Sequence, residues 1–399
     1  MQSAAPAPLV AIACGGTGGH LFPGLAVAEA VKSHGWDALL LISAKAVDQA
    51  AARTAQGMEV ATLPGVGSDR GWLAFLRGFW QSYGVARLLF RQRRPAAVLA
   101  MGGFLSAPPV LAARRLGAAA FIHEANCIPG RANRWLAHFA DEAFSYFPQA
   151  AERLAPARVQ LSGMPVRSQF RPARPELCRE ALGLKPNKPV LLLTCGSQGA
   201  RALNQLLADA LPALTLFEPE LQFIHLTGPE DAGSVHEAYA RHQRRALVAP
   251  FLAEMHLALG AATVALSRAC ASSLAEQAAM RVPSILVPYP AAADNHQYYN
   301  ARAFVETGAA WMQEQRSATV ESLVPELRAL VRDQPVRQGL AAALSRWHEP
   351  RSAQLIARHM IASVAQRVGR PVAEDCAPEP AYAAAANIPL EAVPAETKP

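Results

Sequence analysis

Short, continuously apolar segments alternate with longer segments of helical periodicity along most of this chain. The apolar segments fall at 9–14, 38–43, 97–101, 119–122, 189–195, 222–227, 263–266 and 284–288. Strands without a polar side must be covered on both faces, which is typical of parallel sheets with helices on each side. In such sheets, ligands bind beyond the carboxyl ends of the strands. The sequence therefore predicts an α/β fold built on parallel sheets.

A pattern of strand, glycine turn and helix occurs twice, at 9–31 and again at 191–211. We therefore expect two Rossmann-like domains with parallel sheets facing across a cleft. The proline- and arginine-rich segment at 163–189 is interpreted as a stiff connector between them. The expected divisions are an N-terminal domain at 1–162, a C-terminal domain at 163–345, a C-terminal helix at 346–370 that packs back on the N-terminal domain, and a disordered tail at 371–399.

Composition and charge narrow the class of partner. The net charge of +7 suits nucleic acid, an anionic membrane surface or a phosphorylated substrate. No zinc-finger, basic-zipper or RNA-binding motif occurs, so we expect no nucleic acid partner. Six scattered cysteines without a CxxC pair predict reduced thiols and no zinc site. The sequence shows neither an apolar run of membrane-spanning length nor a signal peptide.

The first glycine turn predicts an anion-binding site. The turn follows an apolar strand and contains Gly15, Gly16, Gly18 and Gly19, while Pro23 suits the first turn of a helix. Such a turn presents free N–H groups and the positive end of the helix dipole to a phosphate. A tight turn that only packs the helix against the strand would use the same glycines.

Two observations refine that prediction. In NAD-binding domains, an acidic residue at the end of the second strand holds the ribose. Here the second apolar strand ends at Ser43, and the nearest acid, Asp48, lies well into the next segment, so the sequence disfavours NAD. His20 follows the glycines directly, and a neutral histidine beside a phosphate site is a candidate general base. A histidine that hydrogen-bonds near the helix N-terminus without moving a proton fits this position equally well.

The second half of the sequence offers two further candidate sites. The loop CGSQGA at 195–200 presents Ser197 and main-chain N–H groups to a second anion. Farther on, a strand leads through small residues into a helix with Glu276 about one turn in, and Gln297 follows a later strand. A carboxylate there can accept hydrogen bonds from two ribose hydroxyls, although the helix dipole favours an ordinary glutamate in the same position. Two anion loops across one cleft favour a transferase over a hydrolase.

Four groups of motifs, spanning roughly residues 9–360, occur in a recognisable order. They are GGTGGHLFPGLAVA (15–28), the segment 101–137 with MGGF and HEAN, GMPVR (163–167) with CGSQGARALN (195–204), and the segment 267–301 with SRACASSLAEQAA and DNHQYYNA. Together they resemble the MurG family of peptidoglycan N-acetylglucosaminyltransferases. The resemblance implies a GT-B glycosyltransferase that moves GlcNAc from UDP-GlcNAc, with inversion, to the MurNAc C4 hydroxyl of undecaprenyl-diphosphate-MurNAc-pentapeptide (lipid I), forming lipid II.

The same resemblance implies site residues, with the acceptor in the N-terminal half and the donor in the C-terminal half. His20 matches a family histidine suggested as the base. The implied substrate-binding positions are Thr17, Gly18, Gly19, Asn126, Arg167, Ser197, Leu252, Ala271, Ser272, Ser273, Leu274, Ala275, Glu276 and Gln297. The sequence departs from the family pattern at Ala125, Met164, Cys195, Ala269 and Cys270.

No Asp-x-Asp motif occurs in the sequence, so we expect neither a metal nor another cofactor. Main-chain donors, a helix N-terminus and Arg167 are expected to stabilise the departing UDP. The family is similarly metal-independent.

The segment 71–95 combines large apolar side chains with arginines. They are Trp72, Leu73, Phe75, Leu76, Phe79 and Trp80, with Arg77, Arg87, Arg91, Arg93 and Arg94. This composition predicts a helix lying on an anionic membrane surface. Together with the lipid acceptor that the resemblance implies, it leads us to expect a peripheral location on the cytoplasmic face of the cell membrane. A helix buried in the domain would share many of the same apolar positions.

Two other functions remain compatible with the sequence. One is a glycolipid glycosyltransferase that uses the same donor and another acceptor. The other is a non-catalytic module that binds a nucleotide sugar or a lipid, which the departures in the donor motifs suggest.

Overall fold

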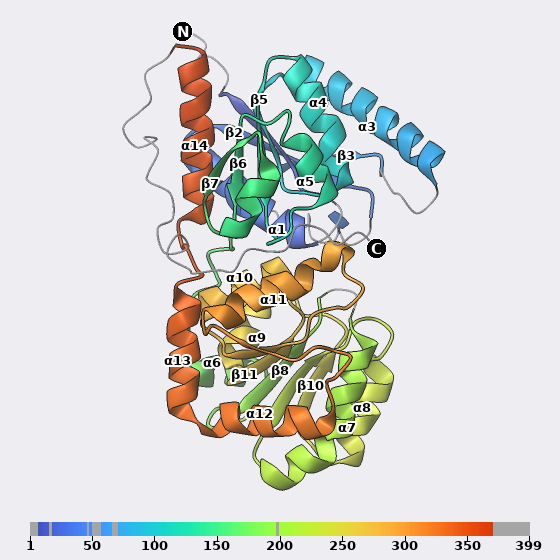
Figure 1. Ribbon diagram of the computed structural model, residues 1–399, viewed down its shortest axis with the longest axis vertical. Helices are drawn as coiled ribbons and strands as arrows, with labels where there is room; N and C mark the ends of the chain where they lie inside the picture. Colours follow the sequence, from blue (N-terminus) through green and yellow to red (C-terminus); the bar gives the residue numbers. More distant parts are fainter. Residues whose placement is uncertain are drawn as a thin grey trace. The chain divides into compact units, whose positions relative to one another are not determined.

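The computed structural model describes residues 7–15, 18–45, 48–49, 57–65, 71–196 and 199–369. The chain forms two compact units, which are treated separately below (Figure 1). The first unit runs to Arg167 and resumes at Glu349, and the second unit covers Ser168–His348. Thr17, Ser197 and the tail at 371–399 lie outside the described residues, and so do the predictions made for them.

The first unit is built on a seven-stranded parallel sheet in the order β3-β2-β1-β4-β5-β6-β7. Its strands are β1 (Leu9–Ala13), β2 (Asp37–Ser43), β3 (Glu59–Leu63), β4 (Pro95–Ala100), β5 (Ala119–Glu124), β6 (Glu142–Ser145) and β7 (Arg158–Leu161). Its helices are α1 (Gly18–Ser33), α3 (Trp72–Gln92), α4 (Ala107–Arg115), α5 (Arg131–Leu136) and α14 (Ser352–Arg367), with short 3₁₀ turns at Phe104–Ser106 and Pro148–Leu154.

Alternate residues of these strands enter two separate cores, because successive side chains of a strand point to opposite faces. Val10 and Ile12 of β1 pack under α1 and α14, whereas Ala11 packs on the side of α4. Helix α4 lies against β4 and β5, and α3 lies against α4 and the edge strand β3 (Figure 1). Both faces of the central strands are therefore covered, as the apolar segments predict.

The second unit repeats this design with six parallel strands in the order β10-β9-β8-β11-β12-β13. They are β8 (Val190–Thr194), β9 (Gln222–Leu226), β10 (Ala246–Ala249), β11 (Val264–Ser267), β12 (Ser284–Leu286) and β13 (Trp311–Met312). The helices are α6 (Pro175–Ala181), α7 (Arg201–Phe217), α8 (Ala232–Arg241), α9 (Met255–Ala261), α10 (Ala271–Met280), α11 (His296–Glu306), α12 (Val320–Arg332) and α13 (Gln334–Ser345), with a 3₁₀ turn at Ala293–Asn295. Two doubly wound α/β units confirm the predicted fold class.

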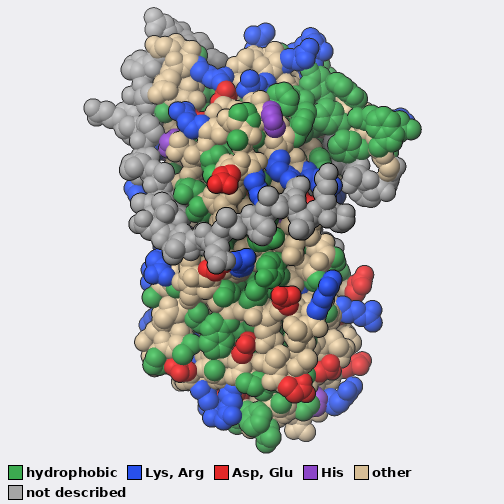
Figure 2. Space-filling view, in the orientation of Figure 1, with side chains coloured by type: hydrophobic (Ala, Val, Ile, Leu, Met, Phe, Trp, Pro, Cys, Tyr) green, Lys and Arg blue, Asp and Glu red, His purple; other side chains and the backbone are tan. Residues whose placement is uncertain are grey.

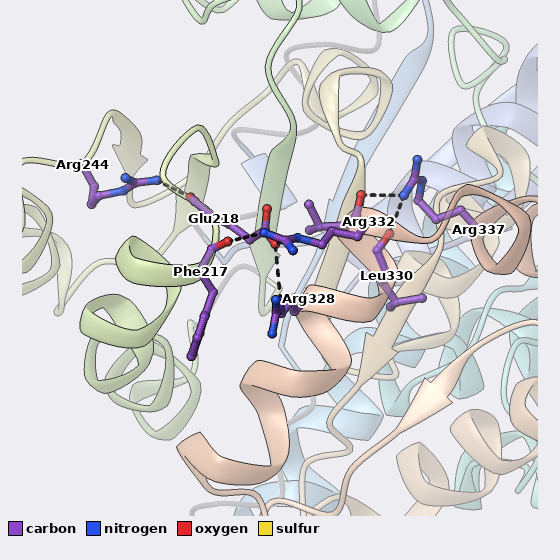
Figure 3. A network of polar contacts seen from close by, with 8 residues as sticks. Phe217, Glu218, Arg244, Arg328, Leu330, Arg332 and Arg337 are labelled. Atoms are coloured by element: carbon purple, nitrogen blue, oxygen red, sulfur yellow. Dashed lines mark hydrogen bonds and ion pairs between the residues drawn. The ribbon is translucent and has the colours of Figure 1, made fainter.

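Arginine side chains contact the C-terminal end of α7 (Figure 3). Arg332 pairs with the Glu218 carboxylate and donates to Phe217 O at 2.8 Å. Arg244 donates to the main-chain oxygens of Glu218 at 3.0 Å and Leu221 at 2.6 Å. Carbonyls at a helix C-terminus have no partner within the helix, so these side chains stabilise the end of α7 and join it to α12.

The boundaries between the units differ by a few residues from the predicted divisions. Residues 163–167 stay with the first unit, since Gly163 lies against Glu349 and the Arg167 guanidinium lies 4.0 Å above the Phe22 ring. Residues up to His348 stay with the second unit, where the buried Trp347 stacks on Phe304 at 4.4 Å. The predicted connector also contains helix α6.

Candidate active site

Each sheet has one place where the strand order reverses direction. In the first unit it lies between β1 and β4, and in the second between β8 and β11. Helices leave adjacent strands toward opposite faces at such a place, so the loops after the two strands part and leave room for a ligand. The glycine turns at 14–18 and 195–200 follow β1 and β8, which puts both predicted anion loops at these reversals.

Packing accounts for one glycine of the first turn. A Cβ at Gly15 would overlap the Leu105 side chain and lie 2.5 Å from Ser43 N at the end of β2. At Gly18, by contrast, a Cβ would meet only its own helix's Phe22, at 3.5 Å. Gly15 is thus required by the fold, whereas the fold leaves room for a side chain at Gly18.

His20 sits in the first turn of α1, against the glycine pair that follows β4. A Cβ on Gly102 would come within 2.8 Å of His20 Cε1, and Gly102 has a φ of +113° that suits glycine. Burial lowers the pKa of His20 below its ordinary value of 6.5, while the Met101 backbone and Asp48 act in the opposite direction. The imidazole is therefore neutral at neutral pH, which is the state that a general base requires.

Arg167 belongs to the same unit as His20 and extends over α1. Its guanidinium stacks on Phe22 at 4.0 Å, and its charge lowers the pKa of Glu29, which burial raises more strongly. The structure thus brings a cation and a neutral imidazole to the first turns of one helix. The role of Arg167 toward UDP stays a prediction.

The end of β5 carries a buried carboxylate that the sequence did not single out. Glu124 Oε1 accepts from Asn126 N at 2.8 Å and Asn126 Nδ2 at 3.2 Å. Its Oε2 accepts from Gly130 N at 3.0 Å and Asn133 Nδ2 at 2.9 Å. Asn126, a predicted binding residue, is therefore half-buried and held by this carboxylate. Only the HEAN motif, matched through the family resemblance, contained a signal for Glu124.

In the second unit, the loop after β8 has one glycine facing open space and one in close contact. Gly196 has a φ of +78°, and a Cβ there would meet nothing within 4 Å. Gly199 has a φ of +73°, and a Cβ there would overlap Thr227 O and lie 2.9 Å from Gly228 Cα. The loop therefore rests on the turn after β9 through Gly199 and leaves the space at Gly196 free.

A series of buried side-chain hydrogen bonds leads to the turn after β9. Tyr239 OH donates to His225 Nδ1 at 3.1 Å, and His225 Nε2 donates to Asn204 Oδ1 at 3.0 Å. Asn204 Nδ2 in turn donates to Thr227 O at 2.9 Å and to Asp231 Oδ2 at 2.8 Å. Burial lowers the pKa of His225 to about 3, so His225 stays uncharged in neutral solution.

Helix α10 begins after β11 and three intervening residues, with Cys270 as its N-cap residue, whose side chain makes no capping hydrogen bond. Ser272, Ser273 and Glu276 are half-buried on its first turns. Gln297 is buried and bridges two loops: its Oε1 accepts from Tyr289 N at 3.0 Å, and its Nε2 donates to Cys270 Sγ at 3.4 Å. Of the predicted donor residues of the C-terminal half that the structure describes, those at 271–276 and Gln297 thus gather at one helix N-terminus, whereas Leu252 lies half-buried in the loop after β10.

Arg268 was not predicted as a site residue, but it connects β11 to the loop after β12 and to Gln315. It donates to Val287 O at 2.9 Å, Pro288 O at 3.2 Å and Gln315 Oε1 at 2.5 Å. Burial raises the pKa of the neighbouring Cys195 thiol to about 12, so this departure from the family pattern places an uncharged thiol in the loop. Across the described ranges, no three His, Cys, Asp or Glu side chains gather as metal ligands would.

Helix α3 presents a wide apolar face to solvent. Only Gly78, Ser82, Ala86 and Phe90 of this helix are buried. Exposed fractions reach 70% at Trp72, 69% at Leu73 and 63% at Trp80, and hydrophobic side chains gather over α3 in Figure 2. This aromatic patch extends through a tilted contact between Phe75 and Phe79 and through edge-to-face contacts that add Phe104, Trp135 and Tyr83. None of the described helices is long and apolar enough to cross a membrane.

Comparisons with known proteins cover both units. Residues 10–145 match the glycosyltransferase family 28 N-terminal domain, and residues 190–355 match the C-terminal domain of that family. The solved structure of Acinetobacter baumannii MurG has a TM-score of 0.69 at 26% identity and covers 89% of this chain and 99% of its own. A UDP-N-acetylglucosamine 2-epimerase with a TM-score of 0.67 shares only the fold, at 14% identity, with 92% of this chain and 99% of its own covered.

Two curated relatives are described as UDP-N-acetylglucosamine–N-acetylmuramyl-(pentapeptide) pyrophosphoryl-undecaprenol N-acetylglucosamine transferases. The protein from Anaeromyxobacter sp. (strain Fw109-5) is 36% identical, with 91% of this chain and 96% of the relative covered. The protein from Acidithiobacillus ferrooxidans (strain ATCC 53993) is 39% identical, with 84% of this chain and 92% of the relative covered. This chain therefore belongs to glycosyltransferase family 28, within the group of these MurG-type transferases.

Proposed function

We propose that this protein transfers GlcNAc from UDP-GlcNAc to the MurNAc C4 hydroxyl of lipid I, forming lipid II with inversion at the anomeric carbon. The observation that carries the proposal is the pair of glycine turns at the reversals of two doubly wound sheets, the first with a neutral His20 beside it. Relatives that bear the name of this reaction match the chain over about nine-tenths of its length.

His20 is the proposed general base. Its neutral imidazole takes the C4 hydroxyl proton while the hydroxyl oxygen forms a bond to the anomeric carbon of GlcNAc. The bond between that carbon and the UDP oxygen breaks, and UDP leaves with the electron pair. The proton stays on the imidazolium until solvent removes it. Contact with Gly102 and the Met101 backbone orients the ring for this step.

The developing charge on UDP needs donors that the fold already holds in place. We propose that the main-chain N–H groups of the 195–200 loop, the N-terminus of α10 and Arg167 supply them. Glu276 is proposed to accept from the two ribose hydroxyls, and Leu252 and Gln297 to border the nucleotide. Thr17, Gly18, Gly19, Asn126 and Ser197 complete the proposed substrate contacts.

The aromatic patch on α3 fits an enzyme whose acceptor is a membrane lipid. Exposed tryptophans enter the interfacial region of a bilayer, and arginines on the same helix attract anionic headgroups. We propose that the protein binds peripherally to the cytoplasmic face of the cell membrane through this patch.

A transfer assay with radiolabelled UDP-GlcNAc and a lipid I analogue tests the function. The wild-type protein is expected to form the disaccharide lipid in the presence of EDTA. His20→Ala is expected to lower kcat by about 10²–10⁴-fold with little change in the KM for UDP-GlcNAc. His34→Ala, at the other end of α1, serves as the control and should leave kcat unchanged.

Three outcomes would overturn parts of the proposal. UDP-GlcNAc binding without any transfer would indicate a binding module. Transfer only to another lipid would change the acceptor. A kcat near the wild-type value in His20→Asn would remove His20 from the role of base.

A further inference from the structure

We propose that Glu124 is a positioning residue for the transfer, acting as an ionised carboxylate that holds Asn126 in its binding conformation. The inference rests on the proposed function. It arises from the side-chain contacts at the end of β5.

The four hydrogen-bond partners described for the Glu124 carboxylate are all donors. Two donors face each oxygen, at 2.8 and 3.2 Å for Oε1 and at 3.0 and 2.9 Å for Oε2. Two of them are main-chain N–H groups and two are side-chain amides, so all must donate. A carboxylate can accept four such bonds, whereas a glutamine would place its own N–H₂ group against two of them.

The carboxylate is also 2% exposed, which makes an unsatisfied neighbour costly. Burial raises the pKa of Glu124, and the four donors oppose that effect by favouring the charged form. With both oxygens occupied in this way, Glu124 is arranged to hold the loop and not to take a proton from a substrate.

The four bonds close the segment 124–133 into a fixed loop around one side chain. Asn126, Gly130 and Asn133 are tied together at residues 2, 6 and 9 after Glu124. The adjacent His123 extends this arrangement, since its Nε2 donates to Gly163 O at 3.3 Å, at the start of the segment that ends at Arg167. The end of β5 thus positions two predicted binding residues, Asn126 and Arg167, within the first unit.

A second buried carboxylate in the same sheet provides a matched control. Glu142 begins β6, the neighbour of β5, and so lies at the amino ends of the strands, whereas Glu124 lies at a carboxyl end. Glu142 is 4% exposed and pairs with Arg158 and, at 3.8 Å, with His359. Its described partners lie on β7 and α14, and neither belongs to the loop 124–133. Glu142→Gln therefore reproduces the loss of a buried charge without disturbing Asn126.

The test combines hydrogen exchange with a double-mutant cycle in the full-length protein. Glu124→Gln is expected to speed amide exchange across 124–133 and to lower kcat/KM by about 10- to 100-fold, as does Asn126→Ala. The double variant should lose no more than Asn126→Ala alone, because Glu124 acts through Asn126. Glu142→Gln should lower stability while leaving exchange in the loop and kcat/KM unchanged.

Wild-type kcat/KM in Glu124→Gln, or losses that multiply in the double variant, would overturn the positioning role. Absence of transfer by the wild-type protein would instead overturn the proposed function, and the exchange measurement would still test the loop. If Glu124→Gln does not fold, Asn133→Ala takes its place, since it removes a single donor to Oε2.

Discussion

The two strand–glycine–helix segments, β1 to α1 and β8 to α7, look alike in sequence and differ in what their glycines do. In the first unit, Gly15 has no room for a side chain because Leu105 and the end of β2 occupy the space. In the second unit, Gly196 faces open space and is required only by its φ of +78°. Gly15 is thus required by packing, and Gly196 by backbone conformation. A glycine pattern alone therefore does not separate a turn that binds a ligand from one that packs a helix.

The largest effect is expected for Gly15→Ala. The new Cβ would lie 2.5 Å from Ser43 N, and a main-chain atom of a buried strand cannot move aside cheaply. We expect a loss of about 3 kcal/mol or more in the free energy of unfolding, at the upper end of overpacking effects. Urea unfolding measures it. A loss below about 1 kcal/mol would show that β2 and Leu105 yield easily.

Acid should weaken both units through buried neutral histidines. Burial lowers the pKa of His123 to about 4 and that of His225 to about 3, so below pH 6.5 the unfolded chain binds protons that the folded chain does not. The stability that the neutral histidines contribute is therefore present above pH 6.5 and is lost as the pH falls toward the two lowered pKa values. Each histidine should reduce the free energy of unfolding by about 2 kcal/mol between pH 6.5 and 5.

Urea unfolding at several pH values measures this slope. His123→Gln and His225→Gln should each remove about one proton from the uptake that accompanies unfolding. An unchanged slope in both variants would contradict the neutral state of these histidines.

A smaller effect is expected for Gly196→Ala. The space around Gly196 is open, so the only cost is that alanine must adopt a left-handed backbone conformation. This should lower the free energy of unfolding by about 1–2 kcal/mol. Because the loop is a proposed donor site, calorimetry should also show weaker binding of UDP. A destabilisation as large as that of Gly15→Ala would remove the contrast between the two turns.

The smallest effect on stability is expected for Gly18→Ala. Its Cβ would meet only Phe22 of the same helix, and alanine is a better helix former than glycine, so the free energy of unfolding should change by about 0.5 kcal/mol or less. The transfer rate should nevertheless fall if this position approaches a ligand. Unchanged stability together with an unchanged rate would leave Gly18 without a role in binding.

The sequence predicted the central strands and missed every edge strand. Each of the eight predicted segments coincides with a strand of the structure, because those segments are apolar on both faces. The four sheet edges are β3, β7, β10 and β13. β3 (EVATL) and β7 (RVQL) contain polar residues that interrupt any apolar run, and β13 has only two residues. β10 (ALVA) is apolar but only half-buried. β6, next to the edge, was missed as well because it is short and begins with Glu142.

Some residues of the candidate site could likewise be predicted from the sequence, and others could not. His20, Gly18 and the N-terminus of α10 could be predicted because each lies shortly after a strand, and local sequence determines that position. Arg268 could not, because its partners lie 19, 20 and 47 residues farther along the chain. Glu124 is bound by near neighbours, but the four donors converge only once the loop has formed. Contacts of this kind depend on tertiary structure, which no local pattern records.

Helix α14 has a consequence for the order in which the chain is made. Its Ile356, Ala357 and Met360 fill the core beneath α1, yet they follow the whole second unit in the sequence. On the ribosome, the second unit can fold as soon as it emerges, whereas the part of the first sheet that α14 covers waits until synthesis is almost finished. A stop codon near residue 349 would therefore yield a chain whose second unit is complete and whose first sheet exposes the side chains of β4 and β5 that face α14 to chaperones and proteases.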